Sequence, residues 1–168
     1  GANVGFSSIY FLNRWPNCRV IAIEADPINF PLLVQNLKPY GDRVLPVLGA
    51  VADLNGHVFV ERSSIGHWAS RISTTNNTSQ PCVPAFTLKT ILSWCPLGNV
   101  DFIKMDIEGA ETRVIPWMFD HLESFAGAKF AVELHNSEAH YQFRKLVELV
   151  DSPVSTFGEY YSITLPSP

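Results

Sequence analysis

Residues 19–37 read RVIAIEADPINFPLLVQNL, and this stretch decides the fold. Its first part, Arg19–Glu24, is short, apolar and rich in β-branched residues, which is typical of a buried strand. Asp26 is a preferred N-cap residue and Pro27 a preferred first helical residue, so a helix is expected from there to about Leu37. The stretch therefore predicts a strand followed directly by a helix, which is the repeating unit of α/β folds.

The same alternation continues on both sides of this stretch. Strands are expected at 44–52, 57–61, 84–88, 100–107, 129–134 and 160–165, and helices at 5–14, 88–94, 109–123 and 137–150. The pair Asn55-Gly56 is typical of a hairpin turn, whereas Ser63–Gln80 is polar and aperiodic and indicates a long loop. Alternating strands and helices predict an α/β fold with a doubly wound, mostly parallel, Rossmann-like sheet flanked by helices.

Length and composition are those of an ordinary globular protein. The 168 residues are 46% hydrophobic and 17% charged, with a net charge of -4, so a single domain over 1–168 is expected. The absence of a basic run argues against nucleic acid or a membrane as partner. Three scattered cysteines do not form a disulfide framework and favour a reducing, cytoplasmic location. No segment reaches the roughly 18 apolar residues of a membrane span.

A glycine-bounded turn, GANVG, occupies residues 1–5. Glycines between a strand and a helix let a ligand approach closely, and the helix start offers free N–H groups. Glu24 ends a strand about twenty residues later, where a carboxylate can accept hydrogen bonds from ribose hydroxyls. The P-loop and GxGxxG patterns are absent, and no Lys or Arg lies between Gly1 and Leu12 to meet a phosphate. The pattern favours a nucleoside ligand without phosphates, such as S-adenosylmethionine, over a purely structural turn.

Three acids crowd the end of the strand expected at 100–107. Asp106 is delivered to the ligand side of the sheet, and Glu108 and Glu111 flank the glycine that opens the next helix. Carboxylates this close together raise one another's pKa or bind a cation. Acids at a helix start also stabilise the helix dipole, and we prefer this interpretation for Glu111 but not for Asp106.

A second polar group follows the strand expected at 129–134. Glu133 and His135 share one face, because side chains alternate along a strand, and both can reach the edge of the sheet. His135 is a candidate general base for a substrate hydroxyl, although a single histidine is more often structural. Asp106 with Glu133, His135 or Asn136 is an alternative set of oxygen and nitrogen ligands for a metal, but no metal is assigned.

The stretches GANVG, IAIEADPINFPLLVQNL, VDFIKMDIEGAE and AVELH resemble the FkbM-type S-adenosylmethionine-dependent methyltransferases. The resemblance extends from Gly1 to about His135, and KMDIEGAE together with EADPINF…QNL is its most specific part. It implies a class I methyltransferase fold and S-adenosylmethionine as cofactor. It also implies that this transferase methylates a hydroxyl on a small-molecule acceptor, such as a sugar or natural product.

The resemblance further implies roles for individual residues. The cofactor-binding residues would be Gly1, Ala2, Asn3 and Gly5 on the methionine side, Glu24 at the ribose with Ala25 beside it, Ala50 and Val51 at the adenine, and Asp106 near the amino group or the substrate. The catalytic candidates are Asp106, Glu133 and His135.

The sequence departs from the family pattern in two places. The acid-bearing apolar strand expected before Gly1 is missing, so we expect the chain to be an N-terminally truncated fragment that lacks the first, central strand of the sheet. In addition, Lys89 rather than an aspartate follows the Thr87-Leu88 pair.

The sequence leaves two other functions open. An NAD-dependent oxidoreductase is built on a similar sheet, although the missing GxGxxG pattern argues against it. A nucleoside- or partner-binding α/β domain without catalysis is also consistent with the sequence. For a methyltransferase, the loop Ser63–Gln80, with His67, Trp68 and Arg71, is a candidate substrate lid.

Overall fold

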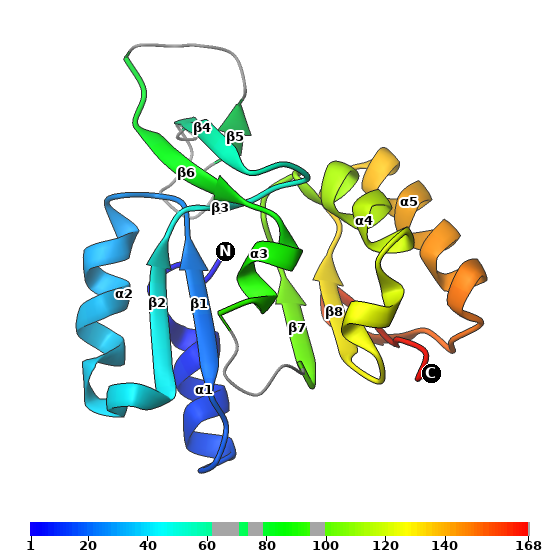
Figure 1. The fold of residues 1–168 in the computed structure, drawn as a ribbon, viewed down its shortest axis with the longest axis horizontal. Helices are drawn as coiled ribbons and strands as arrows, with labels where there is room; N and C mark the ends of the chain where they lie inside the picture. Colours follow the sequence, from blue (N-terminus) through cyan, green and yellow to red (C-terminus); the bar gives the residue numbers. More distant parts are fainter. Residues whose placement is uncertain (62–70, 74–78, 95–99, 168) are drawn as a thin grey trace. The chain divides into compact units, whose positions relative to one another are not determined.

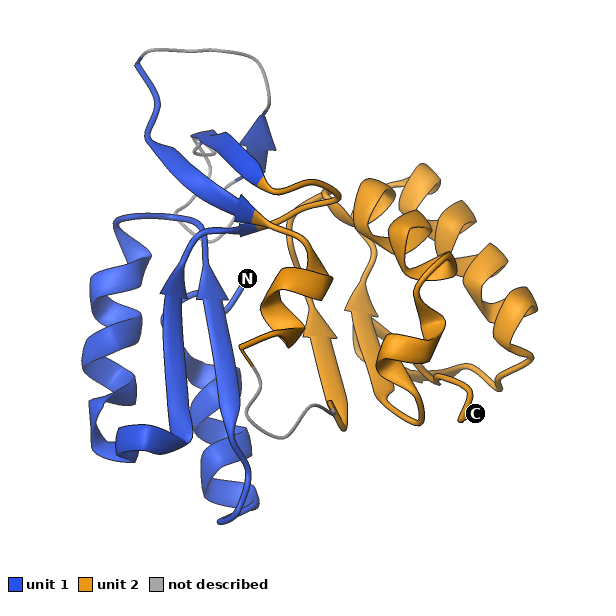
Figure 2. Ribbon diagram, in the orientation of Figure 1, with its two compact units in different colours: residues 1–50, 56–85 blue, residues 51–55, 86–168 orange. Residues whose placement is uncertain are grey.

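The computed structural model describes residues 1–61, 71–73, 79–94 and 100–167. The chain divides into two compact units, which Figure 2 shows in different colours. The first contains Gly1–Ala50 and Gly56–Ala85, and the second contains Val51–Asn55 and Phe86–Pro168. The single domain expected over 1–168 stays a prediction.

The first unit starts with two helices and two strands that alternate along the chain (Figure 1). They are α1 (Phe6–Arg14), β1 (Val20–Glu24), α2 (Asn29–Leu37) and β2 (Val44–Leu48), with the 3-10 segment η1 (Lys38–Arg43) before β2. Strands β1 and β2 are parallel, with Val20 beside Val44 and Glu24 beside Leu48. Apolar residues from the helices and β1 form a buried cluster of Leu12, Ala22, Leu33 and Leu37. The strand and helix predicted within 19–37 are confirmed, although α2 begins at Asn29 rather than at the predicted start, Asp26-Pro27.

The strand expected at 44–52 is interrupted. Gly49 separates β2 from β3 (Ala50–Val51), which belongs to a different, four-stranded sheet. This sheet has the order β3-β6-β4-β5, where β4 is Gly56–Glu61, β5 is Arg71–Ser73 and β6 is Cys82–Phe86. The hairpin predicted at Asn55-Gly56 is wrong, because β6 comes from later in the sequence and lies between β3 and β4. Strand β4 runs antiparallel to both β5 and β6.

The second unit is built on another four-stranded sheet, with the order β7-β8-β10-β9. The strands are β7 (Phe102–Met105), β8 (Lys129–Glu133), β9 (Ser155–Phe157) and β10 (Tyr160–Thr164). Strands β7 and β8 are parallel, so their carboxyl ends lie at the same edge of the sheet. Strand β10 runs antiparallel to β8 and β9.

Three α-helices accompany this sheet in sequence. They are α3 (Leu88–Leu92), α4 (Glu111–Phe119) and α5 (Ser137–Val150), and the 3-10 segment η2 (Leu122–Phe125) follows α4. Helices α4 and α5 lie side by side in Figure 1. Apolar residues of α4, η2, β8 and α5 are buried, among them Ile115, Met118, Phe125, Phe130 and Leu146. Helix α5 has the bounds predicted from the sequence.

The α/β class is therefore confirmed, with mixed strand pairing. The parallel pairs β1–β2 and β7–β8 match the expected mostly parallel arrangement, whereas the β4, β5, β6, β9 and β10 strands add antiparallel pairs. The β9–β10 hairpin was missed, although Gly158 at its turn has a φ of 59° that favours glycine. Short strands joined by tight turns give little periodic signal, so antiparallel additions are harder to predict than the strand–helix alternation.

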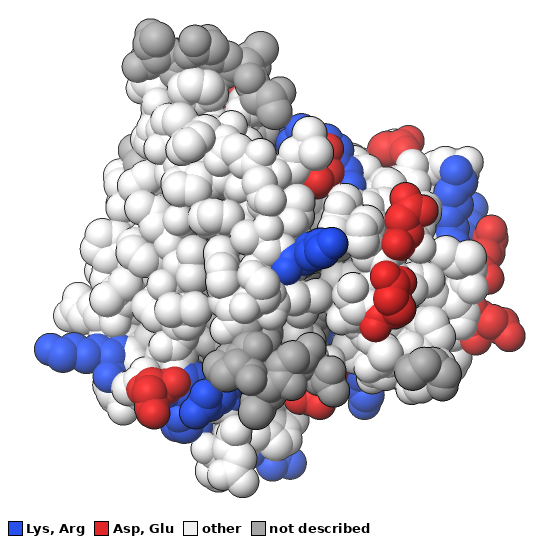
Figure 3. Space-filling model, in the orientation of Figure 1, with Lys and Arg blue, Asp and Glu red and all other residues white. Residues whose placement is uncertain are grey.

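On the face drawn in Figure 3, charged side chains of the described residues lie mainly at the lower left and on the right, and no broad area of one sign is visible. Among the described residues, no helix combines the length and the apolar character needed to cross a bilayer.

Candidate functional site

The GANVG turn is held by backbone hydrogen bonds and by two residues with positive φ. Ala2 N–H donates to Ile23 O on β1 at 2.7 Å, and Gly5 N–H closes the turn onto Ala2 O at 2.9 Å. Asn3 has a φ of 51° and Gly5 a φ of 96°. A Cβ atom on Gly5 would lie 2.9 Å from Cδ1 of the buried Leu33. Gly5 is therefore required both by backbone conformation and by the close packing of α1 against α2.

Glu24 fastens this turn to the end of β1. Its side chain is buried, with 6% exposure. One carboxylate oxygen accepts the N–H of Asn3 at 2.7 Å, and the other accepts the N–H of Asp26 at 2.9 Å. The sequence predicted Glu24 as a ligand residue but did not reveal this structural role, because the Asn3 contact spans 21 positions in the chain.

The structure gathers most of the predicted cofactor residues in the first unit. Those around the end of β1 are Gly1, Ala2, Asn3, Gly5, Glu24 and Ala25, while Ala50 is buried in β3 of the same unit. Val51 and Asp106 belong to the second unit. The cofactor role of all these residues stays a prediction.

A sharp turn follows β7 and places the acids of the second unit. Glu108 and Gly109 have φ values of 54° and 105°, so two successive residues adopt left-handed conformations. Such strain in a non-glycine residue costs about 1–3 kcal/mol and is concentrated at functional sites. Glu111, at the start of α4, holds the turn: its two oxygens accept the N–H groups of Ile107 at 2.9 Å and of Gly109 at 2.7 Å.

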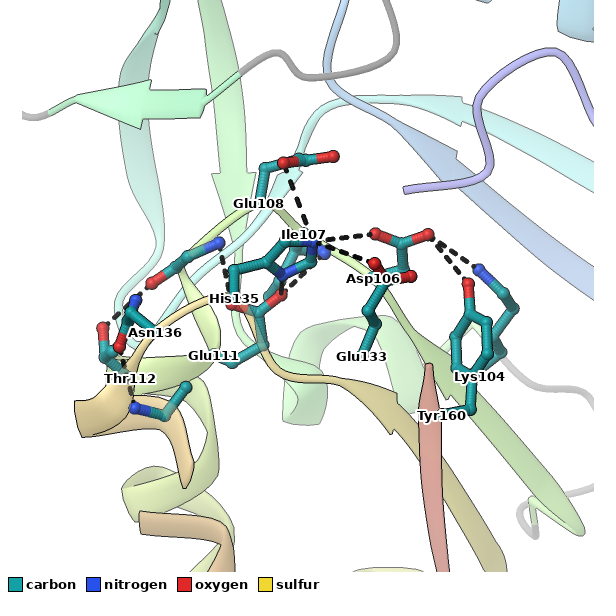
Figure 4. Close-up of polar contacts among 12 residues, drawn as sticks. Lys104, Asp106, Ile107, Glu108, Glu111, Thr112, Glu133, His135, Asn136 and Tyr160 are labelled. Carbon is teal, nitrogen blue, oxygen red and sulfur yellow. Dashed lines mark hydrogen bonds and ion pairs between the residues drawn. The ribbon is translucent and has the colours of Figure 1, made fainter. Parts of the chain in front are cut away.

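Glu111 also orients His135, which follows β8 (Figure 4). The Glu111 side chain has 0% exposure, and its Oε1 lies 3.1 Å from Nδ1 of His135. Because an ionised carboxylate only accepts hydrogen bonds, Nδ1 is the protonated, donating nitrogen of the ring. The expectation that Glu111 merely contributes a favourable charge at a helix start is therefore incomplete.

The other ring nitrogen of His135, Nε2, faces three carboxylates (Figure 4). Its distances are 3.5 Å to Glu133 Oε1, 3.6 Å to Asp106 Oδ1 and 3.7 Å to Glu108 Oε2. The structure thus brings together the three predicted catalytic residues, Asp106, Glu133 and His135, and adds Glu108 to them. We call these four residues the carboxylate–imidazole centre.

Lys104 and Tyr160 hold the second oxygen of Asp106. Lys104 Nζ and the Tyr160 hydroxyl donate to Asp106 Oδ2 at 3.1 Å and 3.0 Å, and the ammonium lies 4.9 Å from the centre of the Tyr160 ring. Partial burial raises the pKa of Asp106, but nearby positive charge, chiefly that of Lys104, and the hydrogen bonds from Lys104 and Tyr160 outweigh it, so the net pKa is lowered. Burial, together with the Asp106 charge, raises the pKa of Tyr160, which keeps the hydroxyl as a donor.

The pKa of Glu108 moves in the opposite direction. Partial burial raises it, His135 opposes this change, and the neighbouring carboxylates of Asp106, Glu133 and Glu111 raise it further. The pKa values of two acids that lie two positions apart in the sequence therefore shift in opposite directions, because Lys104 pairs with Asp106 whereas Glu108 lies among other carboxylates.

Two further predictions concern Asn136 and the candidate lid. Asn136, an alternative metal ligand in the sequence analysis, caps α5 by accepting the Ala139 N–H at 2.9 Å, and its role as a ligand stays a prediction. Of the predicted lid, Arg71 lies in strand β5 rather than in a loop, whereas His67 and Trp68 lie outside the described residues.

Sequence reasoning missed Lys104 and Tyr160. Lys104 precedes Asp106 by two positions, so strand alternation places both on one face, and this signal was available. Tyr160 reaches Asp106 because β10 pairs antiparallel with β8, with Tyr160 opposite Glu133. No local pattern in the sequence specifies that register.

The chain matches the family model described as "Methyltransferase FkbM domain" over residues 1–151. None of the curated proteins matches the chain. Among solved structures, the chain is similar to a precorrin-6y C5,15-methyltransferase from Geobacter metallireducens GS-15, with 15% sequence identity and a TM-score of 0.54. That similarity covers 99% of this chain and 77% of the other. At this identity it shows the fold, which is that of class I methyltransferases.

Proposed function

Because the chain belongs to the FkbM methyltransferase family, we propose that it transfers the methyl group of S-adenosylmethionine to a hydroxyl of a small molecule. The family match supports methyl transfer as the reaction class. The choice of cofactor and of an oxygen acceptor rests on the chemistry of the residues described above.

The glycine turn fits a nucleoside cofactor without phosphates. Each Glu24 carboxylate oxygen accepts one backbone N–H, and a carboxylate oxygen has capacity for a second hydrogen bond, such as one from a ribose hydroxyl. No basic side chain occurs between Gly1 and Leu12, so a pyrophosphate would lack a cationic partner there. We therefore favour S-adenosylmethionine over a nicotinamide dinucleotide, with Gly1, Asn3 and Glu24 as holding residues.

One observation carries the choice of a hydroxyl acceptor: the oriented imidazole of the carboxylate–imidazole centre. Methylation of a hydroxyl oxygen requires loss of its proton, and a positioned base contributes roughly 10²–10⁴-fold to the rate. Glu111 fixes Nδ1 of His135 as a donor, which leaves the lone pair of the neutral ring on Nε2. The proton acceptor is thus drawn from His135, Glu133 and Asp106.

When bound, S-adenosylmethionine supplies an electrophilic methyl group, so that a C–O bond to the acceptor forms as the C–S bond of the sulfonium breaks. The chain's own residues hold and orient the acceptor, and such alignment can supply about 7–11 kcal/mol of the barrier reduction. The acceptor proton passes to the carboxylate–imidazole centre and from there to water.

A methyl-transfer assay tests this proposal. The chain is incubated with S-adenosylmethionine carrying a labelled methyl group and a panel of hydroxyl-bearing sugars and phenols, and the label is located on oxygen by NMR. We expect O-methylated product, and we expect His135→Gln to slow its formation about 10²-fold or more. His57→Gln, on the exposed start of β4, is the matched control and should leave the rate unchanged.

Binding measurements made beside this assay separate the alternatives. Binding of S-adenosylhomocysteine without transfer to any acceptor would favour a non-catalytic nucleoside-binding domain. Binding of NADH in its place would favour the oxidoreductase. A His135→Gln variant as active as the wild-type chain would refute the assigned role of the centre.

A further inference from the structure

The carboxylate–imidazole centre has an unusual feature that proton transfer alone does not require. Three carboxylate oxygens, from Asp106, Glu108 and Glu133, surround Nε2 of His135 at 3.5–3.7 Å. These separations are longer than the 2.7–3.2 Å of an ordinary N–H···O hydrogen bond. When the ring is neutral and Nδ1 donates to Glu111, Nε2 carries a lone pair, and a lone pair facing carboxylate oxygens is repelled by them.

Charge at the centre also favours a cation. Four carboxyl groups converge here, those of Asp106, Glu108, Glu111 and Glu133, and Lys104 pairs with Asp106. The side chains are only 0–26% exposed, so solvent screens repulsion between the carboxylates poorly.

The spacing of the ligand atoms suits one ion. An ion that binds oxygen at about 2.0–2.6 Å places neighbouring ligand atoms about 2.8–3.7 Å apart and opposite ones about 4.0–5.2 Å apart. One ligand atom each from Asp106, Glu108 and His135 lies within 4.8 Å of the other two. The three atoms are therefore already arranged around a volume the size of a metal ion.

We propose that Asp106, Glu108 and His135 bind a divalent cation of the Mg²⁺/Mn²⁺ class. Two carboxylates and one imidazole form an oxygen-rich set that suits such an ion and leaves coordination positions for water or an acceptor oxygen. Glu111 is the positioning residue, because a carboxylate on Nδ1 fixes the tautomer and direction of a metal-binding histidine. Lys104 and Tyr160 orient Asp106 in the same way through its other oxygen.

The cation deepens the proposed function, and only its role in methyl transfer rests on that function. An acceptor hydroxyl bound to the ion becomes more acidic, because the positive charge stabilises the oxyanion. Glu133, which lies beside Nε2 but is not needed as a ligand, then takes the proton. In this arrangement His135 is a ligand of the ion and Glu133 is the base. The proposed function alone had left His135, Glu133 and Asp106 as alternative proton acceptors.

Manganese titration tests the site directly. Mn²⁺ is added to the full 168-residue chain, and unbound Mn²⁺ is measured by electron paramagnetic resonance. We expect one Mn²⁺ per chain, displaced by excess Mg²⁺. Glu108→Gln should weaken binding at least 10-fold, because loss even of a residue that only orients a ligand weakens metal affinity 10–100-fold. Glu148→Gln, on the exposed side of α5, is the matched control and should bind as the wild type does.

Two results would overturn the proposal. The first is a folded wild-type chain that binds no Mn²⁺, which is expected if a second proton occupies Nε2 of His135. The second is a Glu108→Gln variant that binds Mn²⁺ as tightly as the wild type does. Circular dichroism confirms that each variant is folded. S-Adenosylhomocysteine binding, measured in parallel, keeps the two proposals apart. A chain that binds Mn²⁺ but not S-adenosylhomocysteine would refute the proposed function alone. A chain that binds S-adenosylhomocysteine but not Mn²⁺ would refute the cation site alone.

Discussion

Glu24→Gln is the substitution that most sharply tests how the glycine turn is held. In the native chain the buried Glu24 carboxylate accepts the N–H groups of Asn3 and Asp26, one on each oxygen. Glutamine has the same shape but a single oxygen, so its amide NH₂ must face one of these two N–H donors. The substitution therefore removes one charged acceptor, weakens the other, and places two donors against each other.

The expected loss follows from these contacts. Hydrogen bonds to charged groups contribute about 1.5–3 kcal/mol each, and a buried donor left unsatisfied costs about 1–3 kcal/mol. Losing one bond and weakening the second gives a destabilisation of roughly 2–4 kcal/mol. For a chain of this length, each kcal/mol lowers Tm by about 2–4 °C, so we expect Tm to fall by roughly 4–16 °C.

Thermal unfolding followed by circular dichroism measures this effect, with Glu148→Gln on the surface of α5 as the control. S-Adenosylhomocysteine affinity, measured below the Tm of the variant, should also fall, because the turn and the ribose ligand change together. A Glu24→Gln chain with the Tm of the control would show that the carboxylate does not fasten the turn.

Three further substitutions or reactions probe other parts of the structure. Gly5→Ala should lower Tm more than Gly158→Ala. Both glycines have a positive φ, which costs about 1–2 kcal/mol for alanine, but at Gly5 the new Cβ also lies 2.9 Å from Leu33, whereas at Gly158 it meets nothing within 4 Å. Equal losses of Tm would refute the packing argument. Glu111→Gln should lower Tm by about 2–12 °C, because one backbone N–H of the α4 turn loses its acceptor, and an unchanged urea unfolding midpoint would contradict this. Burial raises the pKa of Cys18, so its thiolate forms at higher pH than usual. In a chain whose other cysteines are replaced by alanine, the rate of reaction of Cys18 with iodoacetamide should therefore rise at higher pH than that of a small free thiol. Coincident pH profiles would show that burial has no effect.

The sequence was most informative where local physics decides the structure. Arg19–Glu24 and Ser137–Val150 have the composition and periodicity of one element each, and the structure contains β1 and α5 there. Strand alternation and parallel pairing were enough to expect Asp106, Glu133 and His135 near one sheet edge, and they do lie within contact distance. Their chemical roles stay predictions.

The errors arose where contacts between distant residues decide. Asn55-Gly56 has the composition of a hairpin turn, but β6 occupies the position that β4 would take beside β3. Asn55 instead accepts hydrogen bonds from the Thr87 backbone and the Thr90 hydroxyl, more than 30 positions away. Glu24 and Glu111 each hold a turn by accepting backbone N–H groups, and the sequence did not reveal this role. A carboxylate that binds backbone N–H groups looks the same in sequence as one that binds a ligand.

The central claim is that the chain is a methyltransferase whose glycine turn binds S-adenosylmethionine. Calorimetric titration of S-adenosylhomocysteine into the 168-residue chain tests it most directly, with NADH titrated under the same conditions. We expect one S-adenosylhomocysteine per chain, in the roughly micromolar to millimolar range typical of enzyme ligands, and no heat from NADH. A folded chain that binds NADH, or that binds neither compound, would contradict the claim.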